Sequence, residues 1–253
     1  MGESDRRVVV VTGGTSGIGF AIVGRFLADG CRVALVARKA EHVERALDVL
    51  GRDEDRLVAE AIDVTRRDDV AGFIDRVRKR WDEIAVLVNN AGISPKRKDP
   101  DAPWLVQTSL EEWEQVIDVN LNGPFILTRL VAPAMIARRH GCIINIGSVA
   151  GRAIPLIAGP HGLQSGADWL DSRGRTGPCP HGNTVNCIAP GRILSEMTGP
   201  PETAVNRAAL SRIPIGRFGT AQEVADVVAF FASSSAAFIT GATVDVTGGE
   251  FAA

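Results

Sequence analysis

The chain has 253 residues, 45% of them apolar and 23% charged, which is enough to bury the core of one α/β domain. Its formal net charge of −2 argues against nucleic acid or a membrane surface as the main partner. The four cysteines lack the spacing of a metal site or a disulfide framework, and no apolar run reaches membrane-spanning length. We therefore expect one domain over residues 1–253, cytoplasmic, with reduced thiols and without a signal peptide.

The first predicted element is a buried strand at Val8–Val11, which runs through a glycine-rich turn into an amphipathic helix. Glycines at positions 13, 17 and 19 permit a sharp turn and a close backbone approach to a pyrophosphate at a helix amino terminus. Their spacing, G-x3-G-x-G, differs from the commoner G-x-G-x-x-G. The turn therefore predicts a dinucleotide site, with an ordinary strand-to-helix turn as the alternative.

Strands and helices alternate along the rest of the chain. Further strands are predicted at Arg32–Ala37, Leu57–Ile62, Ile84–Val88, Cys142–Ile146, Thr184–Ile188 and Ala242–Val246. Helices are predicted from Glu41, over Val70–Trp81, over Val224–Phe231, and from a capping box at Ser109–Glu112 to about Arg139 with a bend near Gly123–Pro124. We expect Trp81 and Trp113 in the core. Strict alternation predicts one doubly wound parallel sheet of about seven strands with helices on both faces.

Several short motifs occur in the order and spacing of the short-chain dehydrogenase/reductase family, which the chain resembles over nearly its whole length. The motifs are Thr12-Gly13-x-x-x-Gly17-Ile18-Gly19, Asp63-Val64, Asn89-Asn90-Ala91-Gly92, Asn120, Ser148 and Pro190-Gly191. The chain is most similar to the bacterial 3-oxoacyl carrier-protein reductase and ketoreductase branch. The resemblance implies a Rossmann sheet, a nicotinamide cofactor, a small carbonyl or alcohol substrate, and a homo-oligomer, tetrameric or dimeric.

The resemblance also implies which residues contact the cofactor. The glycine loop would hold the pyrophosphate, Asp63 and Val64 the adenine, and the Asn90 segment the adenine ribose. The implied contacts are Gly13, Thr15, Ser16, Gly17, Ile18, Gly19, Arg38, Asp63, Val64, Asn90, Ala91, Gly92, Pro190, Gly191, Ile193 and Ser195. Taken singly, Asp63 also fits a solvated strand-end carboxylate, and Pro190-Gly191 an ordinary loop turn.

The residues after the second strand bear on the choice of cofactor. Members that use NAD end this strand with an acidic residue that binds the ribose hydroxyls. Here Ala37 is followed by Arg38 and Lys39, so a 2′-phosphate meets no carboxylate and an arginine can bind it bidentately. Thr15 and Ser16 would add hydroxyl donors. This favours NADP(H) over NAD(H); the alternative is that Arg38 is a solvated surface charge.

The catalytic positions depart from the family pattern. In the family, a serine binds the substrate carbonyl, an asparagine holds a water of the proton relay, and a tyrosine acidified by a lysine four residues later donates the proton. Ser148 and Asn120 match, but His161 stands at the tyrosine position and Ser165 at the lysine position, and the chain contains no tyrosine. Histidine can donate a proton, although His161 also fits an ordinary loop residue. We expect weak or no turnover.

The segment that follows has an unusual composition. Its glycines and prolines oppose the long helix that the family has there. When codons chosen for residues 161–173 are read one base later, they spell Thr-Ala-Ser-Lys-Ala-Gly-Leu-Thr-Gly-Leu-Thr-Arg, which resembles the sequence after the family's catalytic tyrosine. We hypothesise that residues from about 161 to 180 are a frame-shifted stretch.

Three functions remain open. The first is an NADP(H)-dependent reductase of ketones or 3-oxoacyl groups, and the second is a cofactor-binding pseudoenzyme. The third is a non-catalytic subunit of a hetero-oligomer. No metal site is predicted. Trp104, Met197 and the segment 198–207 are expected to line or cover the substrate pocket as a lid.

Overall fold

The sheet arranges every predicted strand in one layer. The structure, a computed structural model, describes residues 7–94, 107–151, 182–195, 198–200 and 202–251. The strands are β1 (Val8–Thr12), β2 (Arg32–Ala37), β3 (Leu57–Ala61), β4 (Ile84–Asn89), β5 (Gly141–Ile146), β6 (Asn183–Pro190) and β7 (Thr243–Val246). All neighbouring pairs are parallel, in the order β3-β2-β1-β4-β5-β6-β7. The predicted fold class is confirmed, with strand ends shifted by one or two residues.

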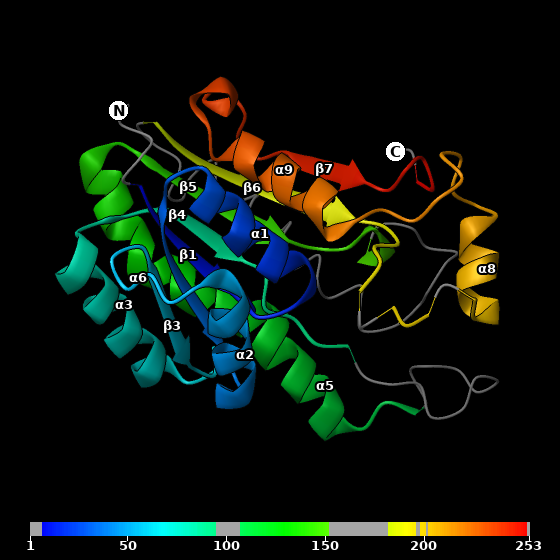
Figure 1. Cartoon of the computed structure of the whole chain (residues 1–253), viewed down its shortest axis with the longest axis horizontal. Coiled ribbons are helices and arrows are strands. Elements are labelled where there is room, and N and C mark those ends of the chain that lie inside the picture. Colours follow the sequence, from blue (N-terminus) through cyan, green and yellow to red (C-terminus); the bar gives the residue numbers. More distant parts are fainter. Residues whose placement is uncertain (1–6, 95–106, 152–181, 196–197, 201, 252–253) are drawn as a thin grey trace.

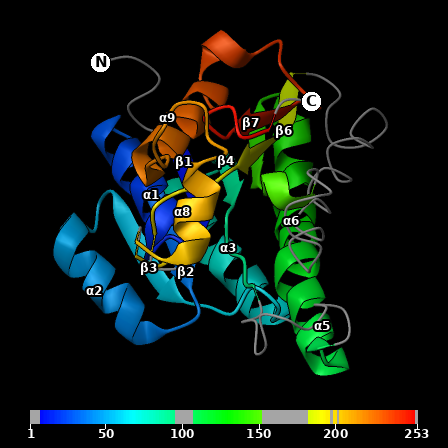
Figure 2. The same cartoon turned by 90° about the vertical axis from the view of Figure 1, so that its right-hand side faces the viewer.

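Helices cover both faces of this sheet (Figures 1 and 2). The helices of the described residues are α1 (Gly17–Ala28), α2 (Ala40–Leu50), α3 (Arg67–Trp81), α5 (Leu110–Ile117), α6 (Gly123–Arg138), α8 (Ala204–Leu210) and α9 (Ala221–Phe231), with short 3₁₀ turns at Val149–Gly151 and Ser234–Ala236. Of these, α8 stands apart from the sheet (Figure 1). Alternate residues of β1 explain the two layers, since successive side chains of a strand point to opposite faces. Val9 and Val11 pack with α1 and α9, whereas Val8 and Val10 pack with α3 and α6.

The long helix predicted after Ser109 is interrupted. Ser109 caps α5 through a complete capping box with Glu112, as expected. The chain then forms a π-helical turn, η2 (Asp118–Asn122), before α6 begins at Gly123. The irregularity therefore lies just before the predicted bend at Gly123–Pro124. Trp81 is buried as predicted, but the prediction for Trp113 is wrong because 40% of its surface is exposed.

The order of the strands decides where a ligand can bind. Neighbouring parallel strands place their carboxyl ends at the same edge of the sheet, and β1 and β4 are adjacent where the chain switches direction across the sheet. Ligands of open α/β sheets bind outside the carboxyl ends at such a point. Among the described residues, no helix combines the length and apolar composition that crossing a membrane requires.

Candidate functional site

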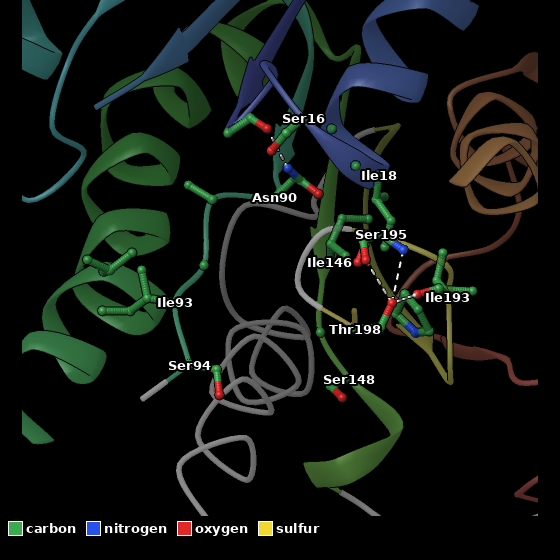
Figure 3. A pocket seen from close by; sticks show the side chains of 18 of the residues that line it. Ser16, Ile18, Asn90, Ile93, Ser94, Ile146, Ser148, Ile193, Ser195 and Thr198 are labelled. Atoms are coloured by element: carbon green, nitrogen blue, oxygen red, sulfur yellow. Dashed lines mark hydrogen bonds between the residues drawn. The ribbon is translucent and has the colours of Figure 1, made fainter. Parts of the chain in front are cut away.

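A cavity of about 970 Å³ lies at the carboxyl edge of the sheet, a volume suited to a large ligand. It extends from the loop after β1, past the ends of β2, β3, β4 and β5, to the segment after β6 and to α8. Figure 3 shows Ser16 and Asn90 toward the top of the view and Ser148 toward its bottom, with Ile193, Ser195 and Thr198 on the β6 side. One cavity thus joins the predicted cofactor residues to a predicted catalytic residue.

The glycine loop between β1 and α1 is shaped by the absence of side chains. Gly13 has φ +66° and Gly17 φ +52°, which side chains disfavour. A Cβ on Gly19 would lie 2.2 Å from the Gly13 carbonyl oxygen, so no larger residue fits there. Ser16 at the helix amino terminus makes no capping hydrogen bond through its side chain. The first residues of α1, Gly17 to Gly19, line the cavity, and the amino terminus of a helix is a favourable place for an anionic group.

Thr12 and Asn90 fasten the ends of β1 and β4 to each other. The Thr12 hydroxyl accepts hydrogen bonds from the backbone N–H groups of Asn90 (3.0 Å) and Ala91 (2.9 Å). In return, the Asn90 side-chain amide donates to the carbonyls of Thr12 (2.9 Å) and Gly13 (3.1 Å). These four bonds fix the glycine loop against the loop after β4. The wall between the two strand ends is thus held rigidly by buried polar contacts.

Charged side chains line the cavity at the ends of β2 and β3. Ala37 ends β2 without a carboxylate, and the basic side chains of Arg38, Lys39 and His42 line the cavity next to it. Asp63, after β3, accepts hydrogen bonds from the backbone N–H (3.0 Å) and hydroxyl (2.8 Å) of Thr65. Its carboxylate is therefore held in a tight turn at the cavity wall. His42, in the first turn of α2, was not predicted, although it lies only four residues after Arg38.

The three predicted catalytic residues have different surroundings. Ser148 lines the cavity after β5, where its Oγ accepts a hydrogen bond from the Ala150 N–H (3.2 Å), and its O–H has no acceptor within the described part of the chain. Asn120 is buried in η2, and its amide pairs with the backbone of Ile93, accepting at 2.9 Å and donating at 3.0 Å. Its neighbour Val119 reaches the cavity, whereas Asn120 does not line it. His161 lies outside the described residues.

The segment after β6 closes the far side of the cavity. Thr198 donates its hydroxyl hydrogen to carbonyls of this segment and accepts a hydrogen bond from the Ser195 N–H (2.9 Å), which rounds the turn (Figure 3). Beyond it, α8 contributes Val205, Ala208 and Ala209 to the lining. Thr198 and Val205 thus match the predicted lid segment, while Trp104 and Met197 lie outside the described residues.

The structure brings all the predicted cofactor residues together around one cavity; their individual roles stay predictions. Three charged side chains in the part of the cavity after β6, Arg192, Arg212 and Glu250, were not predicted from the sequence. Arg192 directly follows the predicted Pro190-Gly191 pair, so its position in that motif was an available signal. No sequence motif indicated Arg212 and Glu250, because 38 residues separate them along the chain.

Comparisons with known proteins agree with this geometry. A family model described as "Enoyl-(Acyl carrier protein) reductase" matches residues 13–250. The chain is 38% identical over 246 residues to an uncharacterized oxidoreductase of Mycobacterium bovis, and 35% identical over 254 residues to the 3-oxoacyl-[acyl-carrier-protein] reductase FabG of Escherichia coli, with 97% of each chain covered in both cases. It is 35% identical, with a TM-score of 0.86, to a crystal structure of a 3-oxoacyl-[acyl-carrier protein] reductase with bound NAD from Brucella melitensis, covering 98% of this chain and 92% of that one.

Proposed function

Because this chain belongs to the short-chain dehydrogenase/reductase family of oxidoreductases, we propose that it uses a nicotinamide cofactor to reduce a ketone or 3-oxoacyl group, or to oxidise the corresponding alcohol. The observation that carries the proposal is the single cavity that holds both the glycine loop and Ser148. The relatives named as 3-oxoacyl reductases support the reaction type.

The residues around the cavity fit a nicotinamide dinucleotide. Because Gly19 has no side chain, a pyrophosphate can come close to the backbone of the glycine loop. The amino terminus of α1, which has no side-chain cap from Ser16, suits the negative charge of that group. Val64 and Asp63 would border the adenine, and Pro190 and Ile193 the nicotinamide. The bound cofactor supplies or accepts the hydride, which is chemistry that no side chain provides.

NADP(H) is the favoured cofactor. Arg38, Lys39 and His42 form a basic wall at the end of β2, and Ala37 leaves no carboxylate to repel a 2′-phosphate. Arginine binds a phosphate through two parallel hydrogen bonds, which adds geometric selectivity to charge. The relative with bound NAD shows that the family accommodates the other dinucleotide as well.

The residues at the proton-donating positions are the ones that fit the proposed reaction least well. Ser148 would donate its hydroxyl hydrogen to the substrate carbonyl and hold it for hydride transfer. His161 would have to supply the proton that a tyrosine supplies in the family, without a lysine at position 165. Losing a positioned acid costs about 10²- to 10⁴-fold in rate. We therefore expect slow turnover in the protein with this sequence.

A second candidate is a cofactor-binding protein that does not turn over, either alone or as a subunit beside an active relative. The absence of tyrosine from the whole chain favours it. The frame-shift hypothesis for residues from about 161 to 180 bears on this choice: sequencing the gene and measuring the mass of this peptide decide whether the substitution is present in the protein.

The two candidates are separated by two measurements on the purified protein of verified mass. NADPH binding, followed by the fluorescence of the reduced nicotinamide, is expected in both cases. NADPH oxidation with a panel of ketones and 3-oxoacyl thioesters is expected only for the oxidoreductase. Failure to bind either dinucleotide at millimolar concentration would contradict the proposal itself.

We also propose that the chain forms a homo-oligomer. Large apolar side chains are exposed on α5 and α6, at Leu110, Trp113 and Phe125, and near the carboxyl end, at Phe230 and Phe238. Exposed apolar groups of this kind mark surfaces that associate. Light scattering is expected to give the mass of a dimer or tetramer, and a monomer at micromolar concentration would contradict this expectation.

A further inference from the structure

A second group of charged side chains lines the cavity, apart from the basic wall at the end of β2. Arg192 follows β6, Arg212 follows α8, and Glu250 lies near the carboxyl terminus. None of them belongs to the predicted cofactor contacts. Their presence at the substrate side of the cavity calls for a ligand group that complements them.

Arg192 is a half-buried cation without a carboxylate partner among the described residues. Its Nε and Nη2 both donate to the side-chain oxygen of Asn206, at 2.9 and 2.5 Å, and Asn206 is a neutral amide that is 1% exposed. A guanidinium has five N–H donors, so three remain without a partner in the part of the chain that the structure describes. Burial lowers the pKa of Arg192, and nearby Arg212 acts in the same direction, against Glu250.

Glu250 does not neutralise both arginines. Its carboxylate forms an ion pair with Arg212 at 3.2 Å, and only 7% of the Glu250 side chain is exposed. The neighbouring lining residues on α8, Val205, Ala208 and Ala209, are apolar. Among the residues that the structure describes here, two guanidinium groups face one carboxylate, which is an excess of one positive charge. A partly desolvated charge of this kind binds an anion more strongly than a fully exposed one does.

The position of Arg192 relative to Ser148 follows from the sheet register. Ile146 of β5 pairs with Ile188 of β6, and the Gly147 N–H donates to the Ile188 carbonyl (2.8 Å). Ser148 lies two residues past the end of β5, and Arg192 lies two residues past Pro190, the last residue of the neighbouring strand β6. Both residues line the same cavity at the carboxyl edge of the sheet, so a ligand in this cavity has Ser148 and Arg192 in its wall.

Resting on the oxidoreductase function proposed above, we propose that the substrate is a carbonyl compound bearing an oxyanion, which Arg192 binds, with Arg212 adding charge, while the carbonyl faces Ser148. The oxyanion is a carboxylate of the substrate itself or a phosphate on a longer thioester arm. Arg192 is then a specificity-determining residue. The competing explanation is that Arg192 serves only to tie α8 to the end of β6 through Asn206.

The test uses pairs of probes that differ in their negative charge. Binding of acetoacetate and of methyl acetoacetate is measured by calorimetry on the full-length protein with NADP⁺, a combination in which the ketone cannot be reduced. Acetoacetyl-coenzyme A and acetoacetyl-N-acetylcysteamine form the second pair. If acetoacetate binds at least tenfold more tightly than methyl acetoacetate, the oxyanion is a carboxylate. If only acetoacetyl-coenzyme A binds at least tenfold more tightly than its partner, the oxyanion is a phosphate.

The variants assign that preference to residues. Arg192→Gln, which keeps a donor for Asn206, is expected to reduce the preference to less than threefold, and Arg192→Lys to retain part of it. Arg212→Gln is expected to weaken it by a smaller factor and serves as the second variant if Arg192→Gln fails to fold. Arg207→Gln is the matched control, since Arg207 lies on α8, contacts the Glu202 carbonyl at 2.7 Å and does not line the cavity.

The outcomes separate this proposal from the proposed function. Equal binding within both probe pairs, or a preference that survives in both arginine variants, overturns the oxyanion site even if NADP⁺ binds. Absence of NADP⁺ binding overturns the oxidoreductase proposal, while the probe pairs titrated without cofactor still report on Arg192. If Arg192→Gln lowers the stability of the protein but leaves the preference for the anionic probe unchanged, Arg192 serves only to hold α8 against the end of β6 through Asn206.

Discussion

The two sides of the cavity depend on different properties of the chain. The side proposed to bind the nucleotide, built from the ends of β1 to β4, is shaped by the backbone: Gly13 and Gly19 leave no room for another atom, and Thr12 and Asn90 hydrogen-bond the strand ends to each other. The reaction side, after β5 and β6, depends on the identity of single side chains such as Ser148. A change of one residue therefore alters the shape on the first side and the chemistry on the second.

If the proposed roles hold, this difference would explain how a chain could keep a dinucleotide site while the residue at the proton-donor position changes. Backbone geometry is maintained by many residues at once, because each hydrogen bond and contact supports the others. A proton donor is a single group, and its replacement changes reactivity directly. Four sets of substitutions test that division.

Restoring the family's proton donor should have the largest effect. The double substitution His161→Tyr, Ser165→Lys is expected to raise turnover by about 10²- to 10⁴-fold, the usual contribution of a positioned acid, with the NADPH dissociation constant within about threefold of the original. Steady-state NADPH oxidation measures the first quantity and fluorescence titration the second. The exposed His140→Tyr substitution is the control and should change neither. No gain in a variant that still binds NADPH would contradict the division of roles.

Adding one methyl group to the glycine loop should abolish binding. In Gly19→Ala the new Cβ would lie 2.2 Å from the Gly13 carbonyl oxygen, so we expect NADPH affinity to fall at least about 100-fold and stability to fall by about 1–3 kcal/mol. Gly24→Ala, on the same helix, meets no atom within 4 Å and should raise stability by about 0.4–1 kcal/mol without affecting affinity. Urea unfolding and NADPH titration of both variants check this. Normal binding in Gly19→Ala would place the dinucleotide elsewhere.

Asn120 is predicted to take part in proton transfer, but its observed contacts are hydrogen bonds to the backbone of Ile93, which hold the loop after β4. Asn120→Ala leaves the Ile93 N–H and carbonyl without their partner, so the free energy of unfolding should fall by about 1–3 kcal/mol. Asn122→Ala, in the same turn, removes only an exposed bond to Asp118 and should cost less than about 0.5 kcal/mol. Equal values for the two in urea unfolding would show that Asn120 does not fasten the loop after β4.

Arg38→Gln should have the smallest effect and should be confined to one cofactor. We expect the NADPH dissociation constant to rise about tenfold, because a charged hydrogen bond to the 2′-phosphate is lost, while NADH binding stays unchanged. Arg52→Gln, which removes an exposed arginine paired with Glu44 and Asp48, is the control. If NADPH and NADH lose affinity equally, Arg38 maintains the shape of the cavity wall and does not bind the 2′-phosphate.

Local patterns were sufficient to predict the sheet and the nucleotide side. The run Val8–Val11 and the capping box at Ser109 and Glu112 are determined within a few residues, and both are confirmed. The π-helical turn at Asp118–Asn122 was not predicted, because it accompanies the contact of Asn120 with Ile93, 27 residues away. Helical spacing likewise assigns Trp113 to a face of α5 without saying whether anything covers that face.

The substrate side was the least predictable part of the site. Arg192 meets Asn206 through side chains alone, 14 residues apart and without any periodic signal. The pairing of Arg212 with Glu250 spans 38 residues. Such contacts depend on how α8 and the carboxyl-terminal segment lie against the sheet, which no single stretch of sequence determines.

The strand order has a consequence for biosynthesis. β3, β2, β1 and β4 lie consecutively in the sheet, and all four are encoded within the first 89 residues. A chain emerging from the ribosome therefore carries a contiguous four-stranded half, with the glycine loop after β1, before residue 161 has been translated. The cavity residues that follow β6, such as Pro190 and Ser195, are translated later, so a change near residue 161 leaves the strands of this first half intact and acts before the cavity wall is complete.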